Sequence, residues 1–446
     1  MIELTAPVER AFLVGAQLKR PSGRNEGTGL TPGGNTGTPR SQLMTEHLEE
    51  LAELVDTAGG IVVGQLTQQI DRPNPATYLG KGKIEELSQR ISETEATLIV
   101  FDDELTPAQG KNVEDATGKR VMDRAELILD IFATRAKSSE AKMQVELAQL
   151  EYMLPRLTRM WTHLEKFRGG IGMRGPGETQ LETDRRLINH RIRLLKQRLS
   201  EVQKSREIRR TARKGQFKAS LVGYTNAGKS SILKALSGAE SVFVEDRLFA
   251  TLDPLTRDIH LAENTSVLLT DTVGFIRKLP HDLVASFRAT LEEVVEADLL
   301  LHVVDASHPS WEEQRIVVNQ VLAEIGASET PTLYVFNKID LIEHDQLIAL
   351  EHRISNLVPG SVFVSAVTDD GLEPLKRALL AHARKRRPLS EIRLPLHDGK
   401  LLAEIHREAE VLDQRHEGGE LVLTARLEDA LAGKLNRAGA GVIPRD

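Results

Sequence analysis

Short apolar runs alternate with amphipathic stretches over the first third of the chain. Residues 59–69 and 96–105 have the apolar character of strands, whereas 82–91 and 107–118 carry the mixed pattern of surface helices. Strands that alternate with helices pair in parallel, because each helix returns the chain to the same end of the sheet. The pattern therefore predicts a small, mostly parallel α/β subdomain over residues 46–136.

Two long helical patterns follow, and their apolar positions recur at intervals of three and four residues. This spacing is typical of two helices that pack along one seam. The first seam contains Met143, Leu147, Leu150, Leu154 and Leu157, and the second contains Ile188, Ile192, Leu195, Leu199 and Val202. We expect an antiparallel helical hairpin over 137–214 with a glycine-rich tip loop at 168–180. A simple helix connection is much shorter, which favours a functional loop over a plain turn.

Strands and helices alternate again from residue 215 to residue 386, which predicts a central domain with a largely parallel sheet. Residues 387–446 then have the pattern of a small mixed α/β domain. Residues 1–45 are interpreted as an N-terminal tail, because the stretch 20–40 is too rich in Gly, Thr and Pro to pack. The predicted fold class is an α/β multidomain protein.

Composition excludes several chemistries and adds one candidate. The chain has no cysteine, which excludes disulfides and thiol catalysis and fits a cytoplasmic location. It has neither an apolar run long enough for a bilayer nor a signal-peptide pattern. Residues 185–214 carry twelve Lys or Arg and two Glu, a net charge of +10. Because the whole chain has a net charge of −7, the other residues together carry −17. This basic segment is a candidate for contact with a polyanion.

A phosphate-binding motif begins at the end of the strand pattern ASLVG. Gly223, Gly228, Lys229 and Ser230 fit the spacing G-x-x-x-x-G-K-[ST], and an amphipathic helix follows directly. The glycines allow successive N–H groups to face the phosphates, while Lys229 supplies a positive charge and Ser230 offers a hydroxyl to Mg²⁺. Strand, glycine loop and helix in this order make a chance match improbable.

A second motif, Asp271-x-x-Gly274, begins 42 residues after Lys229 at the end of another strand pattern. The Asp271 carboxylate is placed to reach Mg²⁺ through water, and Gly274 leaves room for its N–H to approach a γ-phosphate. Between the two motifs, a threonine is expected to close over the metal when the γ-phosphate is present. Thr251 is preferred and Thr256 is the alternative, because spacing does not separate them.

The choice of base is predicted from Asn337, Lys338 and Asp340, which follow a further strand pattern. The Asp340 carboxylate matches the N1–H and 2-amino donors of guanine, which adenine lacks. Ser365 and Ala366 end the next strand, where the Ala366 N–H can reach the base carbonyl. Motifs that stand in this order at the carboxyl ends of strands predict a site for GTP and GDP.

These motifs define a predicted set of site residues, with Mg²⁺ as the cofactor. Catalytic roles are assigned to Lys229, Thr251, Gly274 and Asn226, and metal binding to Ser230, Thr251 and, through water, Asp271. The predicted nucleotide contacts are Gly223, Tyr224, Thr225, Asn226, Ala227, Gly228, Lys229, Ser230, Phe249, Ala250, Thr251, Leu252, Asp253, Asp271, Thr272, Val273, Gly274, Asn337, Lys338, Ile339, Asp340, Ser365, Ala366 and Val367.

With these residues assembled, the chain resembles the HflX family of translation-associated GTPases over most of its length. The resemblance rests on GYTNAGKSS, FATLDPLTR, DTVGFI and NKID, and upstream on NPATYLGKGK and RGPGETQLETDRR. It implies an N-terminal α/β part with a helical hairpin, a central Ras-like GTPase domain and a small C-terminal domain. It also implies a GTPase that binds the large ribosomal subunit and splits stalled ribosomes under stress. We expect this protein to be a monomer.

Phe275 follows the Asp-x-x-Gly motif where familiar GTPases place a water-orienting glutamine. The resemblance implies a hydrophobic residue here, so the water must be positioned by the backbone, by the closing loop or by a partner. In related GTPases that lack the glutamine, an asparagine at the place of Asn226 helps to hold K⁺ against the phosphates. K⁺ is therefore a second candidate cation, and the alternative is that Asn226 only caps the loop.

The basic second helix of the hairpin and its tip loop are candidates for contact with ribosomal RNA. The candidate contact residues are Arg168, Arg174, Arg185, Arg186, Arg191, Arg193 and Lys196. The alternatives are a solvated charged face, a GTP-gated adaptor that does not touch RNA, and a GTPase that modifies or remodels RNA. The motif at 74–83 lacks the phosphate-loop spacing and is interpreted as a structural loop, although the resemblance implies ATP-linked activity in this region.

Overall fold

The computed structural model describes residues 8–19, 40–157, 177–211, 216–238, 245, 247–262, 265–279, 288–396 and 398–445. It divides the chain into two compact units. The first holds Met1–Val202 with two short later segments, Arg247–Phe249 and Lys278–Phe287. The second holds the remaining residues, Gln203–Asp246, Ala250–Arg277 and Arg288–Asp446. No helix of the described residues is long and apolar enough to cross a membrane.

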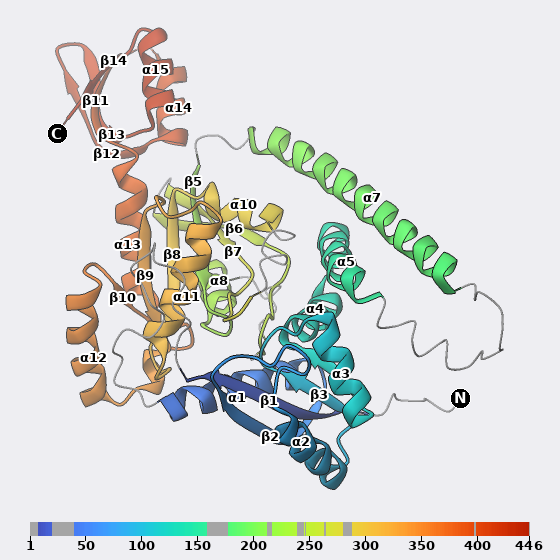
Figure 1. Cartoon of the computed structure of the whole chain (residues 1–446). Helices are drawn as coiled ribbons and strands as arrows, with labels where there is room; N and C mark the ends of the chain where they lie inside the picture. The colour runs from blue at the N-terminus through green and yellow to red at the C-terminus, as the bar shows by residue number, and fades with distance from the viewer. Residues whose placement is uncertain are drawn as a thin grey trace, which may run out of the picture. The chain divides into compact units, whose positions relative to one another are not determined.

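The first unit contains a parallel four-stranded sheet in the order β2-β1-β3-β4 (Figure 1). Its strands are β1 (Arg10–Leu18), β2 (Ile61–Ile70), β3 (Leu98–Phe101) and β4 (Arg120–Asp123). Its helices are α1 (Arg40–Thr57), α2 (Lys81–Thr94), α3 (Pro107–Thr117) and α4 (Arg124–Arg135). Strands alternating with helices confirm the predicted α/β class of this region.

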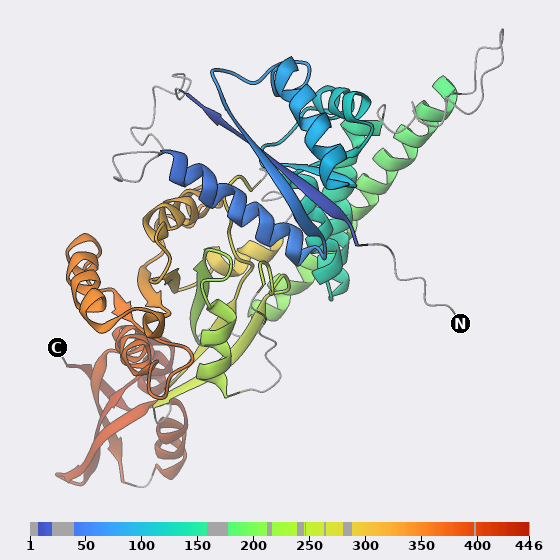
Figure 2. The ribbon, with the colours of Figure 1, turned by 90° about the horizontal axis from the view of Figure 1, so that it is seen from below.

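Both faces of this sheet are covered by helices. The apolar residues of α2 and α3 pack with Phe12 and Val14 of β1 in one cluster. Gly15 faces the other way, toward the side chains of Met44 and Leu48 on α1, and Figure 2 shows α1 lying along the strands. The central strand β1 comes from residues that the sequence analysis assigned to a tail, because a single short apolar run carries too little periodicity to identify a strand.

A helical hairpin follows the sheet, and its residues up to Val202 belong to the same unit. It consists of α5 (Ser139–Met153), the 3₁₀ turn η1 (Leu154–Arg156) and α7 (Gly177–Thr211). The two predicted seams meet in one apolar cluster that contains Met143, Leu147, Leu150, Leu154, Ile188, Ile192, Leu195 and Leu199. Residues 168–176 of the predicted tip loop, with Arg168 and Arg174, lie outside the described residues, whereas residues 177–180 form the first turn of α7 and not a loop.

The second unit contains a six-stranded sheet in the order β10-β9-β8-β5-β7-β6, in which only β6 and β7 are antiparallel. The strands are β5 (Phe217–Gly223), β6 (Leu255–Ala262), β7 (Thr265–Asp271), β8 (Leu299–Asp305), β9 (Thr332–Asn337) and β10 (Val362–Phe363). Helical segments are α8 (Lys229–Ser237), α10 (Arg288–Val295), α11 (Trp311–Glu324), η2 (Ile339–Leu341), α12 (His344–Leu357) and α13 (Glu373–Lys385). This confirms the central domain with a largely parallel sheet that the sequence predicts.

The chain ends in a small domain with the element order β-α-β-β-α-β (Figure 1, in red). Its elements are β11 (Leu389–Pro395), α14 (Gly399–Glu408), β12 (Glu410–Glu417), β13 (Glu420–Arg426), α15 (Asp429–Arg437) and β14 (Gly441–Pro444). The strands form an antiparallel sheet in the order β12-β13-β11-β14, and both helices share one apolar cluster with it. This confirms the predicted small C-terminal α/β region.

Candidate nucleotide site

The phosphate loop connects β5 to α8 and can be formed only with glycine at two positions. Gly223 has φ +152°, and a Cβ there would lie 2.2 Å from the carbonyl oxygen of Val303. Gly228 has φ +93°, and a Cβ there would lie 2.1 Å from Nδ2 of Asn337. The loop is thus pressed against β8 on one side and against the Asn-Lys-x-Asp motif on the other, at the carboxyl edge of the sheet.

Lys229 begins α8 and turns its side chain back into the loop. Its ammonium donates to the carbonyl oxygens of Tyr224 at 2.8 Å and of Gly223 at 3.3 Å. The side chain is buried, and this burial lowers the pKa of Lys229 to about 8, while the nearby Asp271 carboxylate acts in the opposite direction. A buried cation at a helix N-terminus favours an anionic ligand, which would replace the missing solvation.

Three oxygen-bearing side chains converge beside the loop, and we refer to Ser230, Thr251 and Asp271 as the Ser/Thr/Asp cluster. The Ser230 hydroxyl donates to Oδ2 of Asp271 at 2.6 Å and lies 2.7 Å from the Thr251 hydroxyl. The other carboxylate oxygen, Oδ1, is buried and has no hydrogen-bond partner among the described residues. Burial raises the pKa of Asp271. Two hydroxyls and an unsatisfied carboxylate oxygen are ligands that fit Mg²⁺.

Thr256, the alternative to Thr251, lies elsewhere. It is on β6, and its hydroxyl is 2.9 Å from that of Thr270 on β7. The structure therefore brings Thr251 to the cluster and leaves Thr256 in the strand pair.

Gly274 and Phe275 hold the second motif against the phosphate loop through the backbone. The Thr225 N–H donates to the Phe275 carbonyl at 2.7 Å, and the Phe275 N–H donates to the Gly223 carbonyl at 3.0 Å. A Cβ on Gly274 would lie 2.7 Å from Cα of Thr225 and 3.0 Å from Nζ of Lys229. The Phe275 side chain is fully buried, so its role is packing and it cannot orient a water molecule.

The predicted base-reading residues form one hydrogen-bonded group. Asn337 donates from Nδ2 to the carbonyl of Ala227 at 3.0 Å and accepts from the Ala366 N–H at 3.2 Å. The Ser365 hydroxyl donates to Oδ1 of Asp340 at 2.6 Å. Asn337 thus joins the phosphate loop to the loop after β10, and Ser365 orients the carboxylate that the sequence assigns to guanine.

Sequence reasoning missed one residue of this group. Asp305, at the end of β8, lies 2.8 Å from Nζ of Lys338 and fixes that side chain beside the base-reading motif. Lys338 itself has φ +64°, in the left-handed region. Asp305 stands at the carboxyl end of a strand beside β9, and a search of every strand end for polar residues would have found it.

Several predicted contact residues direct their side chains into the protein. Phe249 and Leu252 are buried, and the Thr272 hydroxyl donates to the Leu221 carbonyl at 2.7 Å. Val367, in contrast, is 77% exposed. The side chains of Phe249, Leu252 and Thr272 therefore act in packing.

The candidate RNA-contact residues on α7 fall into two groups. Arg185, Arg186 and Arg193 are exposed. The side chains of Arg191 and Lys196 form ion pairs with Glu146 and Glu151 of α5, at 2.6 and 2.8 Å. The second group links the two helices of the hairpin, which limits what it can offer a polyanion.

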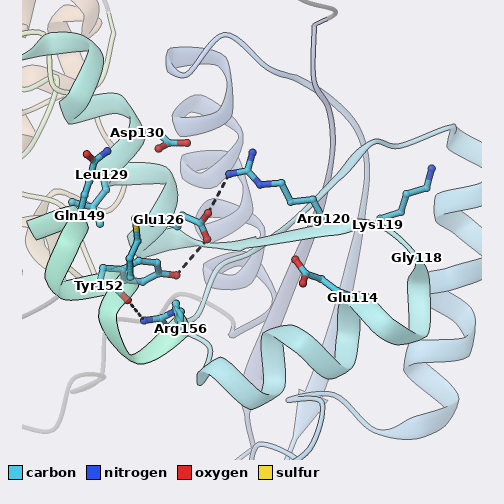
Figure 3. Close-up of a pocket in the computed structure, with 11 residues that line it drawn as sticks. Glu114, Gly118, Lys119, Arg120, Glu126, Leu129, Asp130, Gln149, Tyr152 and Arg156 are labelled. Carbon is cyan, nitrogen blue, oxygen red and sulfur yellow. Dashed lines mark hydrogen bonds and ion pairs between the residues drawn. The ribbon is translucent and has the colours of Figure 1, made fainter. Parts of the chain in front are cut away.

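A cavity of about 680 Å³ lies in the first unit, between the end of α3, α4 and α5 (Figure 3). Figure 3 shows Arg120 and Tyr152 both directed at Glu126, to which Arg120 is ion-paired at 3.1 Å. The Arg156 guanidinium stacks on the Tyr152 ring, 3.6 Å from its centroid. Arg120 and Glu126 thus neutralise one another in the wall, and the residues that line the cavity include neither a glycine loop nor an ammonium group at a helix N-terminus.

The class of protein follows from three features of this site. They are a glycine loop around a buried lysine, the Ser/Thr/Asp cluster, and a carboxylate that can accept from guanine. The second unit contains the guanine-nucleotide site of a P-loop GTPase. Family models agree with this class: "GTP-binding GTPase N-terminal" matches residues 45–133, "GTP-binding GTPase Middle Region" 135–213, and "50S ribosome-binding GTPase" 218–338.

Curated relatives define the family. The HflX GTPase of Flavobacterium psychrophilum is 52% identical over 69% of this chain and 74% of its own length. Those of Magnetococcus marinus and Escherichia coli K12 are 47% and 45% identical, covering 87% and 86% of this chain and 89% and 90% of their own lengths. A solved GTP-binding protein of Sulfolobus solfataricus in complex with GDP is 25% identical, with a TM-score of 0.42, covering 84% of this chain and 99% of its own. The chain belongs to the HflX family of GTPases.

Replacement of Asp340 by Asn tests the base-reading group. The amide offers a donor where guanine needs an acceptor, so the dissociation constant for GTP should rise by about tenfold or more, whereas xanthosine triphosphate should gain affinity. Fluorescence titration with labelled nucleotides measures both. Asp345→Asn, an exposed acid of α12, is the matched control and should leave both affinities unchanged. Unaltered GTP binding by Asp340→Asn would exclude Asp340 as the base reader.

Proposed function

We propose that this protein hydrolyses GTP in a Mg²⁺-dependent reaction, binds the large ribosomal subunit and splits or rescues stalled ribosomes under stress. The observation that carries the proposal is the convergence of the Ser/Thr/Asp cluster on the phosphate loop, 2.6 to 2.7 Å between neighbouring oxygens. The match to a family described as a "50S ribosome-binding GTPase" supports the partner. We also propose a cytoplasmic location and a monomeric state.

Ser230, Thr251 and, through water, Asp271 would hold Mg²⁺, which would supply positive charge to offset the charge that develops on the phosphates during transfer. Lys229 would leave the loop carbonyls for the β- and γ-phosphates, and the Gly274 N–H would bind the γ-phosphate. Asp340 would accept from guanine, and the Ala366 N–H would donate to it. Each of these groups lies at the carboxyl edge of the six-stranded sheet, so one bound nucleotide can reach them all.

We propose that hydrolysis by the free protein is modest. The buried Phe275 side chain offers no group that could orient water. Asn226 is exposed at the loop and adopts φ +58°. This left-handed conformation is tolerated better by Asn than by most residues. The position of Asn226 in the phosphate loop supports a role in holding K⁺ against the phosphates. We also propose that the ribosome increases the rate of GTP hydrolysis further.

The role of K⁺ is tested by replacing the salt. GTP turnover should be about tenfold faster or more in KCl than in NaCl, because a fixed cation offsets transition-state charge. Asn226→Ala should make the two rates equal at the lower value while Mg²⁺-dependent GTP binding persists. Phosphate release at equal ionic strength is the measurement. Equal wild-type rates in the two salts would remove K⁺ from the proposal.

The exposed arginines of α7 are proposed to contact ribosomal RNA. Arg185, Arg186 and Arg193 are exposed on α7, and Arg186 and Arg193 lie on the side of the helix that faces away from α5. A protein with a net charge of −7 approaches a polyanion favourably only through such a local basic surface. Phosphate contacts of this kind weaken steeply with salt.

Changing these three arginines to Gln should lower the affinity for large subunits about tenfold or more. It should also reduce the slope of log affinity against log salt concentration by about one for each lost phosphate contact. Co-sedimentation with a non-hydrolysable GTP analogue, over a series of salt concentrations, measures both. A variant with Arg72, Arg377 and Lys400 changed to Gln removes the same charge from exposed sites elsewhere and should bind normally. Salt-insensitive binding would favour a GTP-gated adaptor without RNA contact, and binding to isolated RNA alone would favour a remodelling role.

A further inference from the structure

The backbone after Asp271 continues beside the end of β5 and the phosphate loop. Within the sheet, Leu221 of β5 pairs with Asp271, the last residue of β7. Further on, Tyr224 and Phe275 form another parallel bridge. The later segment therefore carries one residue more than the stretch beside it, which is the arrangement of a β-bulge. Bulges are frequent beside active sites, because the extra residue turns part of the backbone out of the ladder.

Residues 272–277, which we call the bulged segment, are fastened to β5 and the phosphate loop by hydrogen bonds. Three of these bonds are made by its first four residues. They run from the Thr272 hydroxyl to the Leu221 carbonyl at 2.7 Å, from the Phe275 N–H to the Gly223 carbonyl at 3.0 Å, and from the Thr225 N–H to the Phe275 carbonyl at 2.7 Å. The end of the segment is held by a different kind of contact.

The side chain of Tyr224 supplies this contact. The Arg277 N–H donates to the Tyr224 hydroxyl oxygen at 2.9 Å. Tyr224 is 4% exposed, so the bond is shielded from water, and its loss would leave a buried N–H without this acceptor. The carbonyl oxygen of the same residue accepts from the Lys229 ammonium at 2.8 Å. Tyr224 thus connects the lysine of the phosphate loop to the end of the bulged segment.

Gly274 lies inside the bulged segment, between its bonded residues Thr272 and Phe275. Within the part of the chain that the structure describes, the Gly274 N–H makes no hydrogen bond. A Cβ on Gly274 would lie 3.0 Å from Nζ of Lys229. The N–H is therefore available beside the ammonium that is proposed to bind the phosphates. Such a donor stabilises developing charge best when it is fixed in place before the reaction.

The side chains of residues 272–276 are committed to other contacts. Phe275 and Ile276 are fully buried, Val273 is 6% exposed, and the Thr272 hydroxyl donates to a carbonyl of β5. These residues can therefore position water or a γ-phosphate only through their backbone. An error of about 1 Å in the position of reacting groups can cost about a hundredfold in rate. The contacts that hold this backbone should therefore influence hydrolysis.

We propose that Tyr224 is a positioning residue for GTP hydrolysis. Its hydroxyl holds the Arg277 N–H, and through the bulged segment it fixes the backbone of Gly274 against the γ-phosphate. Binding of GTP and GDP rests instead on the phosphate loop, the Ser/Thr/Asp cluster and the base-reading residues, whose contacts described above do not include this hydroxyl. Removal of the hydroxyl should therefore slow the reaction without weakening binding. This inference rests on the proposed function and deepens it.

The test removes one oxygen atom from the full-length protein. Tyr224→Phe should lower kcat for GTP about fivefold or more, while the dissociation constants of GDP and of a non-hydrolysable GTP analogue change less than about twofold. Phosphate release at saturating GTP and fluorescence titration are the measurements. Tyr334→Phe is the matched control, because the Tyr334 hydroxyl on β9 is bonded to Asn319 at 3.2 Å, away from the nucleotide site. This control should keep the wild-type kcat.

The separation of rate from affinity distinguishes positioning from general stability. An unchanged kcat in Tyr224→Phe would overturn the proposal, and so would equal losses in kcat and in both affinities, which a merely structural contact would give.

Hydrogen exchange supplies a second measurement that does not require turnover. Tyr224→Phe should raise the exchange rate of the Arg277 amide about tenfold or more and leave the amides of β5 unchanged. Identical exchange in the variant and the wild type would overturn the proposal. A wild type that does not hydrolyse GTP would remove the proposed function instead, and the exchange result would still show whether the hydroxyl holds the segment.

Discussion

The nucleotide site depends on the position of one hydroxyl group, that of Ser230. It belongs to the first turn of α8, yet it hydrogen-bonds Asp271 from the end of β7 and touches Thr251 from the loop before β6. Three segments far apart in the chain therefore meet within hydrogen-bond distance. Because Oδ1 of Asp271 is buried without a partner among the described residues, the cluster has a polar requirement that protein groups leave unmet. A metal ion between protein and phosphate would satisfy it.

The close packing of the phosphate loop explains why alanine or a larger residue is excluded at Gly223 and Gly228. The loop around the phosphates is compressed between the backbone of β8 and the side chain of Asn337. Asn337 then transmits the position of the loop to Ala366, so the phosphate and base ends of the site are one hydrogen-bonded structure. Phe275 adds two backbone hydrogen bonds to the phosphate loop, and its side chain is buried. A residue committed to packing in this way leaves water activation to other groups.

Local patterns in the sequence predict the site better than they predict its surroundings. The motifs at Lys229, Asp271 and Asn337 each combine a strand end with fixed spacing, so their residues and their neighbourhood follow from the sequence. The seam of the hairpin was equally accessible, since helical periodicity is local. The choice between Thr251 and Thr256 could not be made from the sequence, because only the folded backbone decides which of the two hydroxyls reaches Ser230. The hydrogen bond between Arg277 and the Tyr224 hydroxyl spans 53 residues and has no spacing rule that could indicate it.

The proposed function depends on the Ser/Thr/Asp cluster holding Mg²⁺, with Thr251 contributing more to the triphosphate complex than to the diphosphate complex. Calorimetric titration of GDP and a non-hydrolysable GTP analogue, each with Mg²⁺ and with a chelator, tests this most directly. Chelation should weaken the analogue by about tenfold more than GDP, which corresponds to about 1.4 kcal/mol. Thr251→Ala should abolish most of that difference. Equal losses for both nucleotides, or no loss for either, would contradict the account.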